Sequence, residues 1–231
     1  MGERPVLDYG RPEPKRRPLR TSWLLKVLGM ILAAYVLIGI AVLIVDQLAM
    51  RQIHDRSGQV HCASNLRQIG QAIQLYTPDN QGLFPPDLQT IARTQQIGLE
   101  CFVCPSSKDS RANDIKELNT PSRCSYVYVD SGFSVHSRPD CIVTLEDPAN
   151  HNLEGGNVLF ADYHVEFLDF PTIQHILNEL NAGRNPPSTL TPTLSQAAAE
   201  KDYQTNWKPR MPQLKSGVWH IPTTQGSATP K

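Results

Sequence analysis

The feature that most constrains this chain is an uncharged apolar run, VLGMILAAYVLIGIAVLIV, at residues 27–45. A helix rises about 1.5 Å per residue, so this run would reach about 28 Å, close to the ~30 Å hydrocarbon core of a bilayer. Trp23 precedes the run and is typical of a membrane interface. A buried core helix normally keeps a polar edge, and the apolar region of a cleaved signal peptide usually covers only about 7–15 residues. The run therefore predicts a transmembrane helix at residues 23–45.

Charge is distributed unevenly about this run. The whole chain has 22 Lys and Arg against 22 Asp and Glu, a formal net charge of zero. Residues 1–26 carry seven basic and three acidic residues, whereas residues 46–231 carry 15 basic and 19 acidic ones. Because basic flanks stay in the cytoplasm, we expect residues 1–22 to be a cytoplasmic basic tail and residues 46–231 to lie outside the cytoplasm. This predicts a single-pass protein with membrane lipid as a partner, and the neutral total argues against nucleic acid.

Residues 46–183 show the periodicities of a small α+β domain. From residue 46 to Tyr76 a helical stripe recurs, which consists of Cys62, Leu66, Ile69, Ile73 and Tyr76. Further helices are predicted at residues 87–96 and 171–182. Four segments alternate like strands, at residues 125–129, 141–145, 157–161 and 164–168. We expect the long helix to pack on a small antiparallel sheet, with a short helix closing the domain.

Residues 184–231 contain seven prolines together with Thr, Ser and Gln and few aliphatic residues. Such a composition buries too little apolar surface to offset the entropy lost when the chain is ordered. We therefore predict a Pro-rich disordered tail from residue 184 onward. Trp207 and Trp219 are expected to be exposed in this tail, and the alternative is that they dock on another surface.

Four motifs occur in order along the chain: CASNLRQIGQAIQLYTPDNQGLFPP (62–86), FVCPSS (102–107), SYVYV (125–129) and NHNLEGGNVLFADYHVEFL (150–168). Together they resemble the bacterial prepilin-like family whose C-terminal signature is His, about nine residues, then Asp-Gly. Those proteins are similar to type II secretion pseudopilins and type IV pilins. The motif residues here are Cys62, Asn65, Leu66, Cys104, Pro105, His151, Gly155, Gly156 and Asp162. The resemblance implies a pilin-like fold, a bacterial inner-membrane location and protein partners in a pilin-like or envelope assembly.

The chain departs from that pattern at two places. Pilin-like precursors carry a Gly-Phe processing site and a Glu just before the apolar run, but residues 20–26 read RTSWLLK. This favours a permanent anchor over a processed fibre subunit. In the signature, Tyr163 stands where the family has glycine after Asp162. Because a two-residue hairpin turn favours glycine there, we expect either strain at Tyr163 or another kind of turn.

The five cysteines favour a structural disulfide in an extracytoplasmic domain. Cys101-x-x-Cys104 is compatible with a disulfide, a redox dithiol or half of a zinc site. The disulfide is favoured, because Pro105 follows directly and the βαβ unit of a thioredoxin-like motif is missing. The candidates for pairing are Cys101, Cys104, Cys124 and Cys141. We expect Cys62 to be a buried, unpaired thiol of the helix stripe.

Four residues are candidate metal ligands by type, namely His151, Asp162, His164 and Glu166. His164 and Glu166, however, alternate on one face of a strand, where polar side chains ordinarily meet water. His151 is expected to close the loop before Gly155 and Gly156 with a hydrogen bond. We therefore predict no metal and no other cofactor.

The sequence shows no Ser-His-Asp, phosphate-binding Gly-rich or paired-acid motif. We predict a membrane-anchored, non-enzymatic structural or interaction protein, which its resemblance links to type II secretion or a related envelope assembly. Two alternatives stay open. One is a membrane-tethered sensor domain that binds a metal or another ligand, and the other is an extracytoplasmic thiol oxidoreductase with a reactive Cys101.

Overall fold

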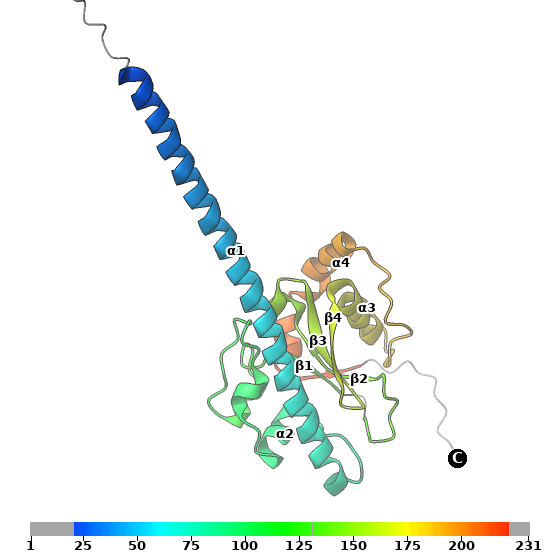
Figure 1. The fold of residues 1–231 in the computed structure, drawn as a ribbon. Helices are drawn as coiled ribbons and strands as arrows, with labels where there is room; N and C mark the ends of the chain where they lie inside the picture. Colours follow the sequence, from blue (N-terminus) through cyan, green and yellow to red (C-terminus); the bar gives the residue numbers. More distant parts are fainter. Residues whose placement is uncertain (1–20, 131, 222–231) are drawn as a thin grey trace, which may run out of the picture. The chain divides into compact units, whose positions relative to one another are not determined.

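A computed structural model describes residues 21–130 and 132–221 (Figure 1). The chain divides into two compact units, residues 1–51 and residues 52–231. The first helix, α1 (Thr21–Tyr76), contributes to both units. The predicted cytoplasmic tail lies outside the described residues up to residue 20.

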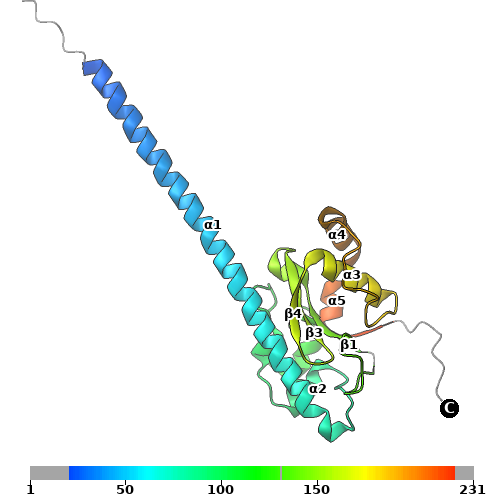
Figure 2. The same ribbon diagram turned by 45° about the vertical axis from the view of Figure 1, so that its right-hand side comes forward.

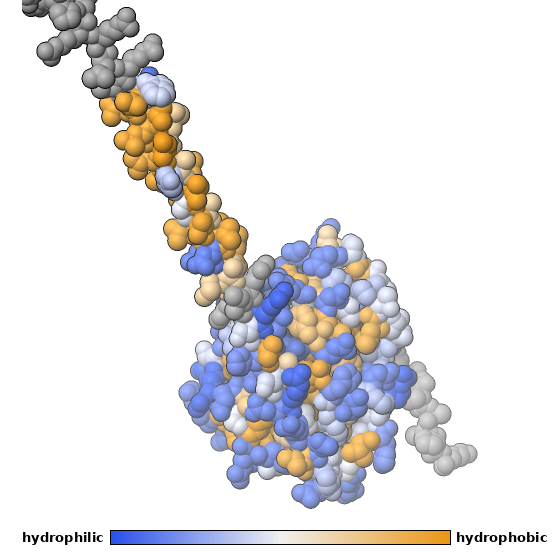
Figure 3. All heavy atoms as spheres, viewed as in Figure 1, coloured by the Kyte–Doolittle hydropathy of each residue, from blue (hydrophilic) through white to orange (hydrophobic). Residues whose placement is uncertain are grey.

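The first unit contains the apolar part of α1. Residues Trp23–Met50 are long and apolar enough to cross a membrane, with a mean hydropathy of 2.8 and no buried residues in the apolar window. Leu32 and Leu37 are 59 % and 66 % exposed, and Figure 3 shows apolar residues dominating this part of the helix. A helix that is apolar all round is suited to lipid. The predicted span is therefore confirmed in length and composition and reaches a few residues further.

The second unit contains a five-stranded sheet in the order β4-β3-β2-β1-β5. The strands are β1 (Tyr126–Asp130), β2 (Ile142–Glu146), β3 (Gly155–Phe160), β4 (Val165–Asp169) and β5 (Val218–His220). Strands β1 to β4 pair antiparallel as predicted, whereas β5 lies parallel to β1. The α+β class is confirmed, but the sheet is mixed, and the prediction of a purely antiparallel sheet is wrong at the β5 edge.

Helices cover both faces of this sheet, as two views of the ribbon show (Figures 1 and 2). Successive residues of a strand face opposite sides. In β1, Tyr126 and Tyr128 join a core with α1, whereas Val127 and Val129 join a second core with α3 (Phe170–Asn181). The predicted α1 stripe supplies the first core with Cys62, Leu66, Ile69 and Ile73, all fully buried.

Short helices join these elements. The predicted helix at residues 87–96 is confirmed as α2 (Leu88–Thr94), and that at residues 171–182 as α3. Both begin at an aspartate N-cap: Asp87 accepts a hydrogen bond from Thr90 N (2.6 Å) and Asp169 one from Thr172 N (3.0 Å). The single-turn 3₁₀ helices are η1 (Pro78–Asn80), η2 (Leu99–Phe102), η3 (Ile115–Asn119) and η4 (Pro148–His151).

The C-terminal region folds against α3, so the prediction of disorder from residue 184 is wrong up to residue 221. It forms α4 (Gln196–Asp202), a π-helical turn η5 (Tyr203–Trp207), α5 (Met211–Lys215) and β5. Tyr203 is fully buried and Trp207 is 2 % exposed, and Trp207 Nε1 donates to Asn178 Oδ1 (3.0 Å). A few aromatic side chains bury 150–250 Å² each, which offsets the scarcity of aliphatic residues. Residues 222–231 lie outside the described part.

The β3–β4 hairpin shows how the chain accommodates Tyr163. Tyr163 N donates to Phe160 O (2.9 Å), and Phe160 N donates to His164 O (3.0 Å). This is a three-residue hairpin loop that ends in a left-handed residue, and Tyr163 takes that conformation at φ 71°. The chain therefore uses a longer turn than expected and still places a bulky residue in a conformation that favours glycine.

Candidate functional site

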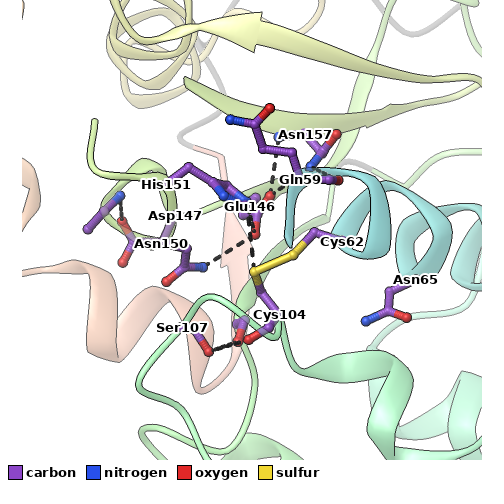
Figure 4. Close-up of polar contacts among 12 residues, drawn as sticks. Gln59, Cys62, Asn65, Cys104, Ser107, Glu146, Asp147, Asn150, His151 and Asn157 are labelled. Carbon is purple, nitrogen blue, oxygen red and sulfur yellow. Dashed lines mark hydrogen bonds and ion pairs between the residues drawn. A yellow bond between two sulfur atoms is a disulfide. The ribbon is translucent and has the colours of Figure 1, made fainter. Parts of the chain in front are cut away.

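Four buried side chains from four separate segments meet in the second unit (Figure 4). Cys62 comes from α1, Cys104 from the loop after η2, Glu146 from the end of β2 and His151 from the end of η4. Their potential ligand atoms all lie within 4.8 Å of one another, and no residue of the four is more than 1 % exposed. We call this group the Cys–Glu–His cluster.

Cys62 and Cys104 form a disulfide with a Cα–Cα distance of 5.2 Å. The prediction of a structural disulfide is thus confirmed for Cys104, but its partner was expected among Cys101, Cys124 and Cys141. Those three are free and buried. The expectation that Cys62 is unpaired is therefore wrong. The physical reason is that the Cys104 loop packs directly on the buried stripe of α1.

Two contacts bring the Cys104 loop onto α1. Asn65 Nδ2 donates to the backbone oxygen of Val103 (3.0 Å), immediately before Cys104. Gly58 lies where a Cβ atom would overlap the hydroxyl of Ser106. Asn65 therefore positions the disulfide loop, and Gly58 leaves room for the Ser106 side chain of that loop against α1.

Glu146 and His151 form a buried pair. His151 Nε2 lies 3.0 Å from Glu146 Oε1 and 3.8 Å from Cys104 Sγ. Glu146 Oε2 also accepts from Asn157 N (3.4 Å) and Asn157 Nδ2 (3.0 Å), and Oε1 from Asn150 Nδ2 (3.5 Å). A buried carboxylate is costly unless it is hydrogen-bonded, and these donors meet that need. His151 Nδ1 finds no partner among the described residues, so its contacts to the cluster run through Nε2.

Local turns fix the direction in which His151 points. Asp147 caps η4 by accepting a hydrogen bond from Ala149 N (3.0 Å), and Pro148 occupies the first helical position, which proline favours. The helix ends at Asn152 in a left-handed conformation at φ 54°. His151 thus returns over the end of β2, toward Glu146.

A polar pocket of about 550 Å³ opens beside the cluster. Its lining includes Lys215, whose Nζ lies 2.8 Å from Asp109 Oδ2 and 3.7 Å from Asp147 Oδ2. Tyr203 OH donates to Asp147 Oδ1 (2.5 Å), and burial, followed by the charge of Asp147, raises the pKa of Tyr203 above its ordinary value. One cation thus faces two carboxylates, and the C-terminal region supplies Lys215 and Tyr203.

The other candidate ligands lie apart from the cluster. Asp162 and His164 pair with each other at the exposed β3–β4 turn, through His164 Nδ1 and Asp162 Oδ1. Glu166 is exposed on β4. His151 is therefore not brought together with Asp162, and the set of ligands considered in the sequence does not form one site.

The remaining motif residues lie outside the cluster, and Leu66, Gly155 and Gly156 have packing roles. Leu66 is fully buried in the α1 core, and Pro105 lies exposed in the turn after Cys104. A Cβ on Gly155 would overlap the backbone oxygen of Leu168 on β4, and one on Gly156 would lie 3.3 Å from Glu146 O on β2. The two glycines therefore let β3 fit between its neighbours.

Burial raises the pKa of all three free thiols. Burial raises the pKa of Cys124 to about 12, and burial followed by the charge of Glu100 raises the pKa of Cys101. Burial, followed by the charge of Asp140, also raises the pKa of Cys141. Since the thiolate is the nucleophile, a raised pKa is the opposite of what a reactive cysteine needs. The oxidoreductase alternative thus gains no support at Cys101, whose Sγ donates to Gln68 Oε1 (3.1 Å).

Sequence reasoning did not select Glu146 or Asn157. Both had a readable signal: Glu146 directly follows the apolar run of β2, and Asn157 stands in an otherwise apolar strand. An acidic residue at the end of a buried strand is expected to have a buried partner, because charged side chains are seldom fully buried unless they are paired. In this structure the partner of Glu146 is His151.

Comparisons with known proteins do not assign a family. No family model matches the chain. No curated protein and no solved structure matches it either.

Proposed function

We propose that this protein is a membrane-anchored, pilin-like structural or interaction protein of a bacterial inner membrane. It holds a folded α+β domain outside the cytoplasm, where the domain contacts protein partners of a secretion or envelope assembly. The proposal rests mainly on the difference between two parts of α1. One part of this helix is apolar and unburied over Trp23–Met50, and a later part supplies the core stripe of the folded unit.

Two further features support the orientation. The basic residues cluster before the apolar run, which favours a cytoplasmic N-terminus. A disulfide within the folded unit suits an oxidising compartment. Together they favour an exported domain on a permanent tether, for which a processing site before the apolar run is unnecessary.

Two of the exposed apolar side chains of the folded unit, Val60 and Phe167, line the same surface hollow and are candidates for contact with a partner. Val60 on α1 is 67 % exposed, and Phe167 on the edge strand β4 is 38 % exposed. An edge strand presents unpaired backbone groups that another chain can join. Leu190, 39 % exposed in the segment before α4, has comparable exposure to Phe167 but lies outside the sheet and serves as a control position.

The test is site-specific photocrosslinking of the full chain in native membranes. A photoreactive residue is placed at Val60, Phe167 or Leu190, and crosslinked species are identified by mass spectrometry. We expect a defined product from Val60 or Phe167 that contains an envelope or secretion protein or a second copy of this chain, and none from Leu190. Only uncrosslinked monomer at all three positions would contradict the proposal.

A further inference from the structure

The Cys–Glu–His cluster has the donor set of a zinc site. Two sulfurs, one imidazole nitrogen and one carboxylate oxygen converge within 4.8 Å, and the four residues are closed off from solvent. Zn²⁺ prefers four such ligands in a tetrahedron, and structural zinc sites leave no position open to water. This group, unlike the exposed Asp162–His164 pair, also comes from four segments that the fold must hold together.

The distances can be compared with a tetrahedron. With zinc–sulfur bonds of about 2.3 Å and zinc–nitrogen or zinc–oxygen bonds of about 2.1 Å, sulfur and nitrogen ligands lie about 3.6 Å apart, and nitrogen and oxygen about 3.4 Å apart. The corresponding separations are 3.8 Å from Cys104 Sγ to His151 Nε2 and 3.0 Å from His151 Nε2 to Glu146 Oε1. Both separations lie within about 0.4 Å of the tetrahedral values.

Two contacts have to open before a metal can bind, the hydrogen bond between His151 Nε2 and Glu146 Oε1 and the disulfide itself. Two thiolates on the same zinc ion lie about 3.8 Å apart, whereas a disulfide holds its sulfurs about 2.0 Å apart. Cleavage of the bond followed by a sulfur movement of about 2 Å would complete the tetrahedron. A change of the χ1 rotamer of Cys62 or Cys104 can move a sulfur by about that distance. Glu146 and His151 lie on other elements and need not follow.

We propose that Cys62, Cys104, Glu146 and His151 form a redox-dependent zinc site. A dithiol reductant donates two electrons and two protons: the Cys62–Cys104 bond breaks, two thiols form, and the reductant becomes a disulfide. One Zn²⁺ then binds both sulfurs, His151 Nε2 and a Glu146 oxygen. The two thiol protons pass to solvent, and the proton shared by His151 Nε2 and Glu146 moves to His151 Nδ1, which has no partner among the described residues. The reduced form of the site binds Zn²⁺ or a divalent ion with similar ligand preferences, and the oxidised form binds none.

The surroundings of Glu146 fit a ligand role. Ligating carboxylates are held by outer hydrogen bonds that fix their orientation. Asn157 donates to Glu146 twice, and Asn150 donates to its other oxygen. Asn157 Nδ2 also donates to the backbone oxygen of Gln59 (3.2 Å), which connects this shell to α1 one turn before Cys62. Either the disulfide or the metal therefore fastens α1 to the Cys104 loop and to the sheet.

The test uses the full chain purified in detergent, either oxidised or reduced with a phosphine that does not compete for zinc as a thiol would. After equilibration with Zn²⁺ and removal of free metal, bound zinc is measured by elemental analysis. We expect one zinc ion per reduced chain and none per oxidised chain. Loading with Co²⁺ should give the visible bands of a tetrahedral ion and a thiolate-to-cobalt charge-transfer band.

Variants identify the ligands. Cys104→Ser and Glu146→Gln should each weaken binding by at least about tenfold. Cys124→Ser removes an equally buried thiol outside the cluster and should bind as the parent does. Equal zinc content in the oxidised and reduced parent would overturn the proposal, as would full binding by a chain lacking both Cys62 and Cys104. Because the parent comparison needs no substitution, poor folding of a variant cannot obscure the result, and the outcome does not depend on membrane anchoring or partners.

Discussion

Breaking the Cys62–Cys104 disulfide should cost the folded unit a large part of its stability. The bond joins residues 42 apart in the sequence. In the chain-entropy relation, a closed loop of that length contributes about 13 cal/mol/K, or about 4 kcal/mol at 25 °C. Domains of this size are typically stable by only about 5–15 kcal/mol, so reduction should leave a marginal fold.

The assay is urea unfolding of the full chain in detergent micelles, oxidised or reduced, with a chelator present so that no metal compensates. Trp207 and Trp219 are 2 % and 6 % exposed and report unfolding by fluorescence. A Trp23→Phe background removes the signal from the apolar helix. With a urea dependence of about 2 kcal/mol per molar, a loss of 4 kcal/mol moves the midpoint down by about 2 M.

Two outcomes would refute the loop-entropy reasoning. A midpoint change below about 0.5 M would mean that the disulfide contributes little, and a similar drop on reduction of a Cys62→Ala, Cys104→Ala chain would assign the effect to the reductant. As a positive control, the Cys124→Ser chain should show the full shift, since Cys124 is a free thiol.

Three further predictions follow from individual side chains. Trp207→Ala should lower the free energy of unfolding of the folded unit by about 3–5 kcal/mol, as measured by thermal unfolding. Leu190→Ala should change it by less than about 0.5 kcal/mol. Equal effects of the two substitutions would contradict a packed C-terminal region. Arg184, followed by hydrogen bonds from Ser188, lowers the pKa of Glu179 to about 2 against the effect of burial. Its stabilisation should therefore be complete above about pH 4.5 and be lost as the pH falls toward 2, and a Glu179→Gln chain with the same acid profile would refute this. Tyr163→Gly should be about 1 kcal/mol more stable than Tyr163→Ala, since both lose the ring and only glycine relaxes the positive φ; no difference by urea unfolding would refute backbone strain.

Periodicity carried most of the fold prediction. The apolar run, the stripe on α1 and the four antiparallel strands are local patterns. Each can be recognised within a short window of sequence, without knowledge of the rest of the chain. The C-terminal region shows where such reasoning stops. Its composition resembles that of a disordered segment, but Trp207, Tyr203 and Met211 find a surface on α3, and that surface is visible only after the sheet and α3 have formed.

The cysteines show the same limit in a site. Cys101-x-x-Cys104 is the cysteine motif that is easiest to recognise in the sequence. In the structure, however, Cys101 Sγ donates a hydrogen bond to Gln68, and Cys104 forms its disulfide with Cys62. Spacing along the chain describes neighbours in sequence, whereas a disulfide depends on which Cβ atoms the packing of helix and loop brings within reach.

The cluster raises the question of why a buried core would keep Glu146 and His151 beside a disulfide. Replacing a buried ionisable pair with apolar residues of similar size is often neutral or stabilising, so such a pair is weak support for stability alone. A disulfide needs no carboxylate or imidazole beside it, whereas a zinc ion held by two thiolates takes two further ligands, which an imidazole and a carboxylate can supply. A metal site explains why all four residues of the cluster lie together, whereas a purely structural disulfide explains only the two cysteines. That difference makes the zinc content of the reduced chain the measurement that decides between the two roles.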